Sequence, residues 1–238
     1  MRKICVLTLT ALIALSFIAT LPLSAYAAES SVQLTAIEWY NMENIEKENP
    51  HKASSRQIPT TDNAMSNPDF KLLSFHWDST ANYLINPANK YHFSASDVVK
   101  AITASADTWD AQTGAIVFSY SGTADLKAGK RDGYNVVSWG NYKKGVLAVT
   151  YLWRSGTNIV ETDTLINELY EWSLSDGAGK MDLQNIMTHE FGHWCGLDDL
   201  YADKDYWLTM YGYSDYGETY KRTLGLGDTL GLKAVYGA

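Results

Sequence analysis

The sequence predicts an α+β domain of five strands and three helices, preceded by a leader segment and a polar extension. Two observations carry this prediction. Short runs rich in β-branched and aromatic residues, which favour strands, fill the middle of the chain. Stretches with apolar residues three and four positions apart, and with capping residues at their starts, flank these runs. We therefore expect a leader over residues 1–27, an extension over 28–68 and one folded domain over 69–238.

The first 27 residues have the composition of a signal peptide. Arg2 and Lys3 precede an apolar run over residues 4–23, and Ala25-Tyr26-Ala27 ends the segment as a small-residue cleavage site. The alternative is a membrane anchor, but Pro22 and the small residues after it favour cleavage, and no second long apolar run follows. The sequence predicts a secreted, extracellular protein without stable membrane insertion.

The predicted mature chain is acidic and has one cysteine. Loss of Arg2 and Lys3 with the leader changes the formal net charge from −8 to −10. An acidic surface argues against nucleic acid and anionic membranes as partners, so we expect protein or peptide partners, and a monomer. Only Cys195 remains once Cys5 is removed, which excludes an intramolecular disulfide. The domain must rely on its core, to which the many Trp and Tyr residues contribute.

Residues 28–68 are mostly polar, with a charged cluster over 43–52 and turn-forming residues over 59–68. The stretch 32–40 has a few apolar residues but no sustained period. This composition indicates a propeptide or a poorly ordered extension. The alternative, packing of the extension on the domain, is nearly as well supported.

The predicted strands and helices alternate from residue 70 onward. A helix over 94–114 has a capping-box-like start at Ser94 and Asp97 and ends at Gly114. Asp182 caps a second helix, whose apolar residues repeat at spacings of three and four, and a last helix covers 228–236. The strands are predicted over residues 70–77, 115–120, 134–139, 146–153 and 159–166.

The second helix carries the pattern His-Glu-x-x-His-x-x-Gly-x-x-Asp over residues 189–199. Residues four apart share a helix face, so His189 and His193 can direct ring nitrogens at one metal ion. Gly196 can take the left-handed conformation that ends a helix, which turns the chain back with Asp199 as a third ligand. Three protein ligands and an open position for water make a catalytic zinc site.

Glu190 lies beside the first ligand and can reach a metal-bound water without binding the metal. Zinc lowers the pKa of that water, so Glu190 can accept its proton during attack on a peptide carbonyl and pass it to the leaving amine. A carboxylate ligand adds negative charge and weakens the metal as a Lewis acid. Asp198 is an alternative third ligand, although the spacing favours Asp199, and Glu218 is a weaker alternative.

This pattern resembles that of the metzincin zinc endopeptidases, with Asp199 where most members carry His, as in snapalysin-type secreted bacterial peptidases. The rest of the chain resembles the matrixins. Thr209-Met210-Tyr211-Gly212 resembles their Met-turn, Gly145-Val146-Leu147-Ala148 their substrate-binding strand, and residues 227–237 their closing helix. The resemblance implies one mixed five-stranded sheet and a zinc metallopeptidase catalytic domain over residues 69–238.

The resemblance also assigns roles around the metal. Met210 is expected to form an apolar floor beneath it, and Tyr213 to line the specificity pocket. Substrate is expected to lie extended along residues 145–151, pairing main chain with main chain. Tyr211, Tyr213 and Tyr216 are candidates for lining the pocket or stabilising an oxyanion, with a plain surface loop as the alternative.

Some matrixin features are missing from this sequence. No Cys in the N-terminal segment can maintain latency through zinc, and the His set for a second, structural zinc is absent. His51, His76 and His92 lie outside any ligand spacing. Calcium is possible in the acidic, glycine-bearing loop over residues 123–135, without a spacing that compels it.

The sequence therefore predicts a secreted zinc endopeptidase with one catalytic Zn²⁺. The alternative is a catalytically weak or inactive relative that binds peptides or a cell-surface protein. The intact Glu190 argues against that alternative.

Overall fold

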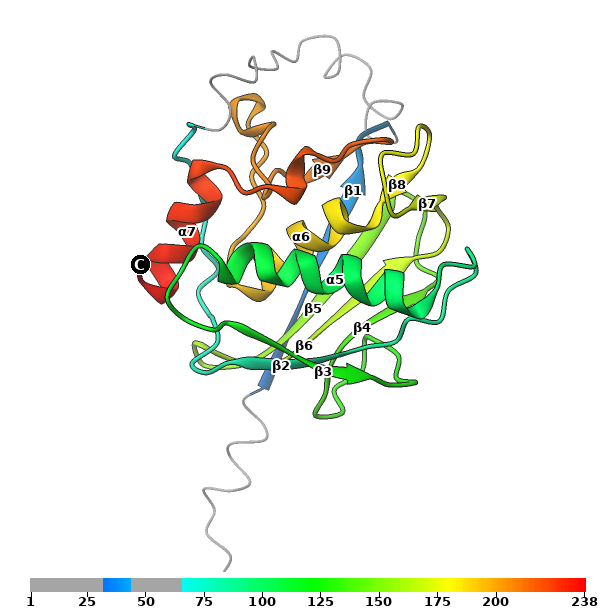
Figure 1. Ribbon diagram of the computed structural model, residues 1–238. Coiled ribbons are helices and arrows are strands. Elements are labelled where there is room, and N and C mark those ends of the chain that lie inside the picture. Colours follow the sequence, from blue (N-terminus) through cyan, green and yellow to red (C-terminus); the bar gives the residue numbers. More distant parts are fainter. Residues whose placement is uncertain (1–31, 44–65) are drawn as a thin grey trace, which may run out of the picture. The chain divides into compact units, whose positions relative to one another are not determined.

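The computed structural model describes residues 32–43 and 66–238, which are built around one large sheet (Figure 1). The spatial order of its seven strands is β3-β2-β4-β6-β5-β1-β9. They are β1 Val32–Asn41, β2 Ala81–Ile85, β3 Phe118–Thr123, β4 Asn135–Gly140, β5 Val146–Ser155, β6 Asn158–Asn167 and β9 Tyr213–Ser214. Two short strands, β7 Trp172–Ser173 and β8 Met181–Asp182, pair with each other apart from this sheet.

The large sheet is mixed, as expected. Strand β2 runs parallel to β3 and β4, and β4 runs parallel to β6. Strand β5 is antiparallel to β6, β1 is antiparallel to β5, and β9 is parallel to β1. The α+β class and the mixed sheet are confirmed, and β1 and β9 extend the sheet beyond the five strands expected.

The helices are α5 Ala95–Asp110, α6 Leu183–Trp194 and α7 Leu226–Tyr236, with short 3-10 turns at Asp203–Asp205 and Tyr220–Arg222. Both predicted caps are present. Ser94 Oγ accepts a hydrogen bond from Asp97 N at 3.1 Å, and Asp182 Oδ1 accepts one from Asn185 N at 2.8 Å. Within the part of the chain described here, no helix combines the length and apolar character needed to cross a membrane.

Helices α5 and α6 lie next to each other over one face of the sheet (Figure 1). Trp109 at the end of α5 is fully buried, and its Nε1 donates a 2.7 Å hydrogen bond to the carbonyl of Thr188 in α6. Tyr83 of β2 contacts Phe191 and Trp194 of α6 through their rings. The core therefore fixes α6, the helix with the predicted metal ligands, against both α5 and the sheet.

The predicted strand over residues 70–77 is wrong. This segment makes isolated bridges, from Leu72 to Leu197 and from His76 to Asn158, while Phe75 and Trp77 are buried in the core. Its aromatic side chains give it strand-like composition, but they fill the core without a continuous ladder partner. The strand of the sheet here is β2, which the sequence analysis missed.

Two boundaries also differ from the prediction for one shared reason. The Asp110 carboxylate accepts hydrogen bonds from Val117 N at 3.0 Å and Phe118 N at 3.3 Å. This contact ends α5 at Asp110, before Gly114, and starts β3 at Phe118. The segment between them is a turn, in which Ile116 is exposed.

The sequence predicts no strand over residues 32–40, and the structure has β1 there. Its register with β5 runs from Val32 opposite Ser155 to Tyr40 opposite Val146. Most side chains of β1 are exposed or half-buried, so no alternation marked it as a strand. Residues 32–43 thus pack on the domain. The predicted signal peptide over 1–27, His51 and the rest of the extension up to residue 65 lie outside the described residues.

Candidate metal centre

Two turns of α6 bring the predicted histidine ligands together. The Nε2 atoms of His189 and His193 lie 3.1 Å apart, and both side chains are fully buried. The Nδ1 atom of His189 lies 2.7 Å from the carbonyl oxygen of Thr209, and that of His193 lies 2.9 Å from the carbonyl oxygen of Leu197. Since a carbonyl accepts only, each Nδ1 carries the proton, and both Nε2 lone pairs face the same point.

The turn after α6 supplies the third group. Gly196 has a φ of +88°, and a Cβ there would lie 2.8 Å from the Phe75 carbonyl oxygen, so both conformation and space favour glycine. The chain then returns over the histidines. Asp199 Oδ1 lies 3.1 Å from His189 Nε2 and 3.6 Å from His193 Nε2. Among residues 32–43 and 66–238, these three form the cluster of His, Cys, Asp or Glu able to hold an ion.

The donor set fits zinc. Two imidazole nitrogens and a carboxylate oxygen are the ligand types of catalytic zinc sites. Asp199 Oδ1 is buried without a hydrogen-bond partner among the described residues, although its other oxygen accepts a 2.8 Å bond from the Tyr201 hydroxyl. Unprotonated lone pairs and an unpartnered carboxylate oxygen that converge in a buried place fit a cation bound between them.

Glu190 lies outside the ligand cluster, and a hydrogen bond from the sheet positions its carboxylate. Its Oε2 accepts a 2.5 Å hydrogen bond from the Thr150 hydroxyl of β5, while its Oε1 is buried and has no hydrogen-bond partner in the described part of the chain. Thr164 of β6 lies 2.6 Å from Thr150 Oγ1 and accepts a bond from Trp194 Nε1. The series Trp194, Thr164, Thr150 fixes one oxygen of Glu190 and leaves the other free.

Burial and neighbouring charges shift the pKa values of Glu190, His189 and Asp199. Burial raises the pKa of Glu190 to about 7 and lowers the pKa of His189 to about 4. Burial also pushes the pKa of Asp199 upward, but the neighbouring His193 and His189 outweigh it and hold that pKa below its ordinary value. A neutral His189 beside an ionised Asp199 has the protonation states that metal ligands require.

A comparison with family models gives one match. The matrixin model matches residues 76–237, about two thirds of the chain and all of the site described above. The chain belongs to the matrixin family. No curated protein matches the chain. Family and geometry together make this domain a zinc-metallopeptidase domain of the metzincin type, with His189, His193 and Asp199 as the group that fits the metal.

In this matrixin, the two alternative carboxylates lie in other contacts. Asp198 forms a 2.7 Å ion pair with Lys71, and its backbone N–H bonds the Lys71 carbonyl. Glu218 is paired with the buried Lys221. His76 Nε2 lies 3.6 Å from Asp78 Oδ1, and His92 lies in the irregular segment before α5, so neither joins the metal cluster.

Residues Thr209 and Met210, which are expected to form the floor beneath the metal, contact the ligand-bearing helix α6. Met210 is buried, and its sulfur packs so closely on Gly192 of α6 that a Cβ at residue 192 would collide with it. The carboxylate of Asp228, at the start of α7, accepts hydrogen bonds from Thr209 N at 2.8 Å and Met210 N at 3.0 Å. Because the Thr209 carbonyl orients His189, Asp228 supports a ligand two contacts away.

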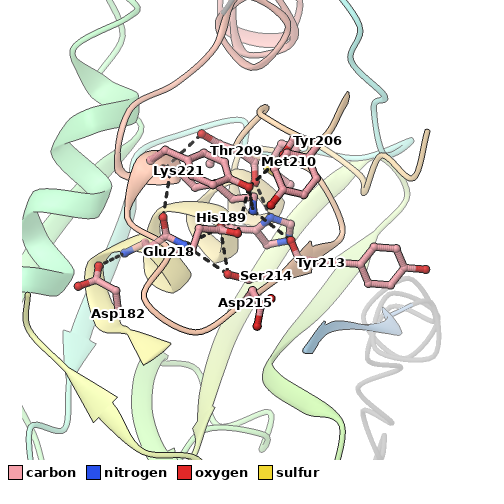
Figure 2. A network of polar contacts seen from close by, with 12 residues as sticks. Asp182, His189, Tyr206, Thr209, Met210, Tyr213, Ser214, Asp215, Glu218 and Lys221 are labelled. Carbon is pink, nitrogen blue, oxygen red and sulfur yellow. Dashed lines mark hydrogen bonds and ion pairs between the residues drawn. The ribbon is translucent and has the colours of Figure 1, made fainter. Parts of the chain in front are cut away.

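A buried polar network adjoins the Met-turn (Figure 2). Lys221 Nζ is fully buried, pairs with Glu218 and donates a 3.0 Å bond to the Tyr213 carbonyl. Glu218 Oε1 also accepts bonds from Ser214 Oγ at 3.0 Å and Asn185 Nδ2 at 2.9 Å. These contacts fix the segment that contains Tyr213, the residue expected to line the specificity pocket.

The tyrosines of this segment differ in their surroundings. Tyr211 is fully buried, and its ring lies against those of Tyr206 and Tyr213. Tyr213 is half-buried beside Tyr201, and Tyr216 is exposed. The segment therefore has a buried aromatic side chain at Tyr211 and partly or fully exposed ones at Tyr213 and Tyr216.

Sequence reasoning missed several residues that contact the site. Tyr201 bonds Asp199, Thr150 bonds Glu190, and the Trp39 ring stacks on that of His189 at 3.8 Å between centroids and 6° between planes. Thr150 and Trp39 are far from the motif along the chain, and no local pattern marks them. Tyr201 lies two residues from Asp199, and a hydroxyl that close to a carboxylate ligand was an available signal.

The loop over residues 123–135, considered for calcium, is held by carboxylates from β6. Asp163 accepts bonds from Gly129 N at 2.7 Å and Val136 N at 2.9 Å. Glu161 accepts bonds from Asp132 N at 2.7 Å and Gly133 N at 2.9 Å. Backbone donors thus already engage these two buried carboxylates.

Proposed function

We propose that this matrixin is a secreted zinc endopeptidase in which His189, His193 and Asp199 hold the metal and Glu190 transfers the proton. The observation that carries the proposal is the convergence of two Nε2 lone pairs and Asp199 Oδ1, next to a glutamate with one unpartnered oxygen. A glutamate beside the ligands gives a metal-bound water a proton acceptor, which a ligand set alone does not.

When bound, zinc supplies a Lewis acid that polarises a peptide carbonyl and makes water acidic enough to attack it. Glu190 Oε1 accepts the proton of the attacking water, and the same atom returns it to the leaving amine. The Thr150 hydroxyl keeps Oε2 occupied, so the proton is handled at one oxygen. A pKa near 7 suits a group that must both accept and donate a proton near neutral pH.

Extended peptides are the proposed substrates, because the side of β5 that pairs with β1 in this structure lies beside Glu190, which Thr150 of β5 contacts. A hollow of about 330 Å³ beside Asp199 and Tyr201 leaves room for water on this side of the ligands. The aromatic residues around Tyr213 favour a bulky apolar or aromatic side chain just after the cleaved bond.

The decisive experiment compares Glu190→Ala with the unchanged full-length chain. We expect the variant to lose hydrolysis of a casein or fluorogenic peptide substrate while keeping zinc near one per chain. Glu171→Ala, at an exposed glutamate, is the matched control and keeps activity. Loss of zinc from Glu190→Ala, or retention of most activity, contradicts the assigned role. A chelator abolishes hydrolysis by the unchanged chain.

Secretion is the second part of the proposal, and it rests on the predicted signal peptide. Expression with the native N-terminus in a secreting host should release a protein that begins at Ala28. N-terminal sequencing checks this, and a retained Met1 in the membrane fraction contradicts it.

A further inference from the structure

Strand β1 lies where the proposed substrate would bind. It runs antiparallel to β5 on one side and parallel to β9 on the other, with Tyr40 opposite Tyr213. Strand β5 carries Thr150, the partner of Glu190, and β9 follows the Met-turn that contacts His189. A peptide between these two strands therefore crosses the metal centre and gains main-chain hydrogen bonds on both sides.

Trp39 is the residue of β1 that reaches the centre. The register with β5 slips between Trp39 and Tyr40, and such a bulge redirects a side chain. The Trp39 ring is fully buried and stacks on His189, and Lys221 Nζ lies 5.6 Å from the ring centroid. Its Nε1 has no hydrogen-bond partner among the described residues, so stacking and burial hold the indole.

Glu38 provides a second anchor on the opposite face of β1. Its carboxylate accepts bonds from the hydroxyls of Tyr142 and Tyr40, each at 2.7 Å, and pairs with Lys143 at 2.6 Å. Lys143 and Tyr142 precede β5. The two successive residues Glu38 and Trp39 thus bind two different walls of the cleft.

We propose that β1 occupies the peptide-binding cleft as an intramolecular, substrate-like inhibitor anchored by Trp39. This inference rests on the proposed function, since it takes the groove between β5 and β9 as the substrate site. It adds that the pocket beside His189 accepts an indole, and that an extended peptide binds only when β1 leaves.

The distribution of burial along β1 supports a detachable ligand over a permanent core strand. Its other side chains up to Tyr40 are exposed or half-buried, and Leu34 is 55% exposed. Buried apolar contact is therefore concentrated in Trp39 and in Met42 just after the strand, with the polar Asn41 buried between them. A ligand on the same chain acts at a high effective concentration, so it inhibits without strong contacts along its length.

The test compares Trp39→Ala with Leu34→Ala in the full-length, zinc-loaded protein. An internal competitor raises the apparent KM and leaves kcat unchanged. We expect Trp39→Ala to lower KM for a fluorogenic peptide about tenfold or more with little change in kcat. The Leu34→Ala control, which removes an exposed side chain from the same strand, should behave like the unchanged chain. Equal KM values in all three proteins overturn the proposal.

Hydrogen exchange gives a readout independent of catalysis. In a Glu190→Ala background, amides of residues 146–155 should exchange at least about tenfold faster with Trp39→Ala than with Leu34→Ala, because β1 no longer covers that edge. Unchanged exchange overturns the proposal. If no variant hydrolyses peptide but exchange still accelerates, the proposed catalytic function fails while the docking of β1 stands.

A peptide added in trans separates docking from misfolding. The peptide of residues 32–43 should inhibit full-length Trp39→Ala competitively, and a version with Ala for Trp39 should be about tenfold weaker. A circular dichroism spectrum and melting temperature near those of the unchanged chain establish that Trp39→Ala is folded. Equal potency of the two peptides overturns the role of Trp39 as anchor. If Trp39→Ala does not fold, Glu38→Ala, which loses the contacts to Lys143 and Tyr142, replaces it with the same expected direction.

Discussion

The sulfur of Met210 lies directly against Gly192, so the Met210 side chain packs on the backbone of α6 between the two histidines. A Cβ at residue 192 would also lie 2.8 Å from Trp109 Cζ2. Glycine is unfavourable in helix interiors, and its presence between the two histidines reflects this close approach.

Gly192→Ala should destabilise the protein, although Ala is the better helix former. Overpacking at a buried contact costs about 1–3 kcal/mol, which exceeds the propensity gain of at most about 1 kcal/mol. Chemical denaturation measures the free energy of unfolding. Gly114→Ala, at an exposed glycine whose added Cβ makes ordinary contact, is the control and should change stability little. A stabilised Gly192→Ala would contradict the packing described.

Asp228→Ala should weaken both folding and metal binding. Its carboxylate accepts three backbone N–H groups, from Thr209, Met210 and Gly225, and each unsatisfied buried donor costs about 1–3 kcal/mol. We expect a loss of about 3 kcal/mol or more in the free energy of unfolding, together with weaker zinc binding. Asp176→Ala, at an exposed aspartate, should leave both unchanged. An Asp228→Ala protein with full stability would remove Asp228 as a support of the Met-turn.

Zinc titration should rank three substitutions on the third ligand. Asp199→Ala removes a ligand and should reduce affinity most. Tyr201→Phe removes the hydroxyl that orients Asp199 and should cost about ten- to a hundredfold. Asp198→Ala breaks an ion pair with the exposed Lys71 and should have the mildest effect. If Asp198→Ala proves more damaging than Asp199→Ala, the assignment of the third ligand is wrong.

The buried pair of Lys221 and Glu218 should show a non-additive response. Lys221→Met leaves a buried carboxylate without its cation and should cost about 3–5 kcal/mol. The double variant Lys221→Met/Glu218→Gln removes both charges, and we expect it to regain a large part of that loss. Denaturation of both variants gives the coupling free energy. A double variant less stable than Lys221→Met would mean that Glu218 is stabilised independently of Lys221.

Much of the metal centre could be predicted because its ligands lie within eleven residues. His189, His193 and Asp199 are related by helix periodicity and one glycine turn, both of which are local properties. The caps at Ser94 and Asp182 are equally local. Strands β4, β5 and β6 were also found, since each is a continuous apolar or β-branched run between turns.

The contacts that escaped prediction join distant segments. Thr150 reaches Glu190 across forty residues, and β1 pairs with a strand more than one hundred residues further along the chain. The sequence of β1 has no strand pattern of its own, and only its pairing with β5 and β9 identifies it as a strand. The stretch over residues 70–77 shows the opposite error, since its buried aromatic residues gave it the composition of a strand without a ladder.

The acceptors that orient the two histidines are main-chain carbonyls, at Thr209 and Leu197, whereas the donor that orients Asp199 is the hydroxyl of Tyr201. Replacing the side chain of residue 209 or 197 leaves its carbonyl in the chain, but a single change at residue 201 removes the hydroxyl altogether. A point substitution at residue 209 or 197 therefore keeps the carbonyl that orients the corresponding histidine. Among the groups that bond the three ligands directly, only the one on Asp199 can therefore be removed by a single side-chain substitution.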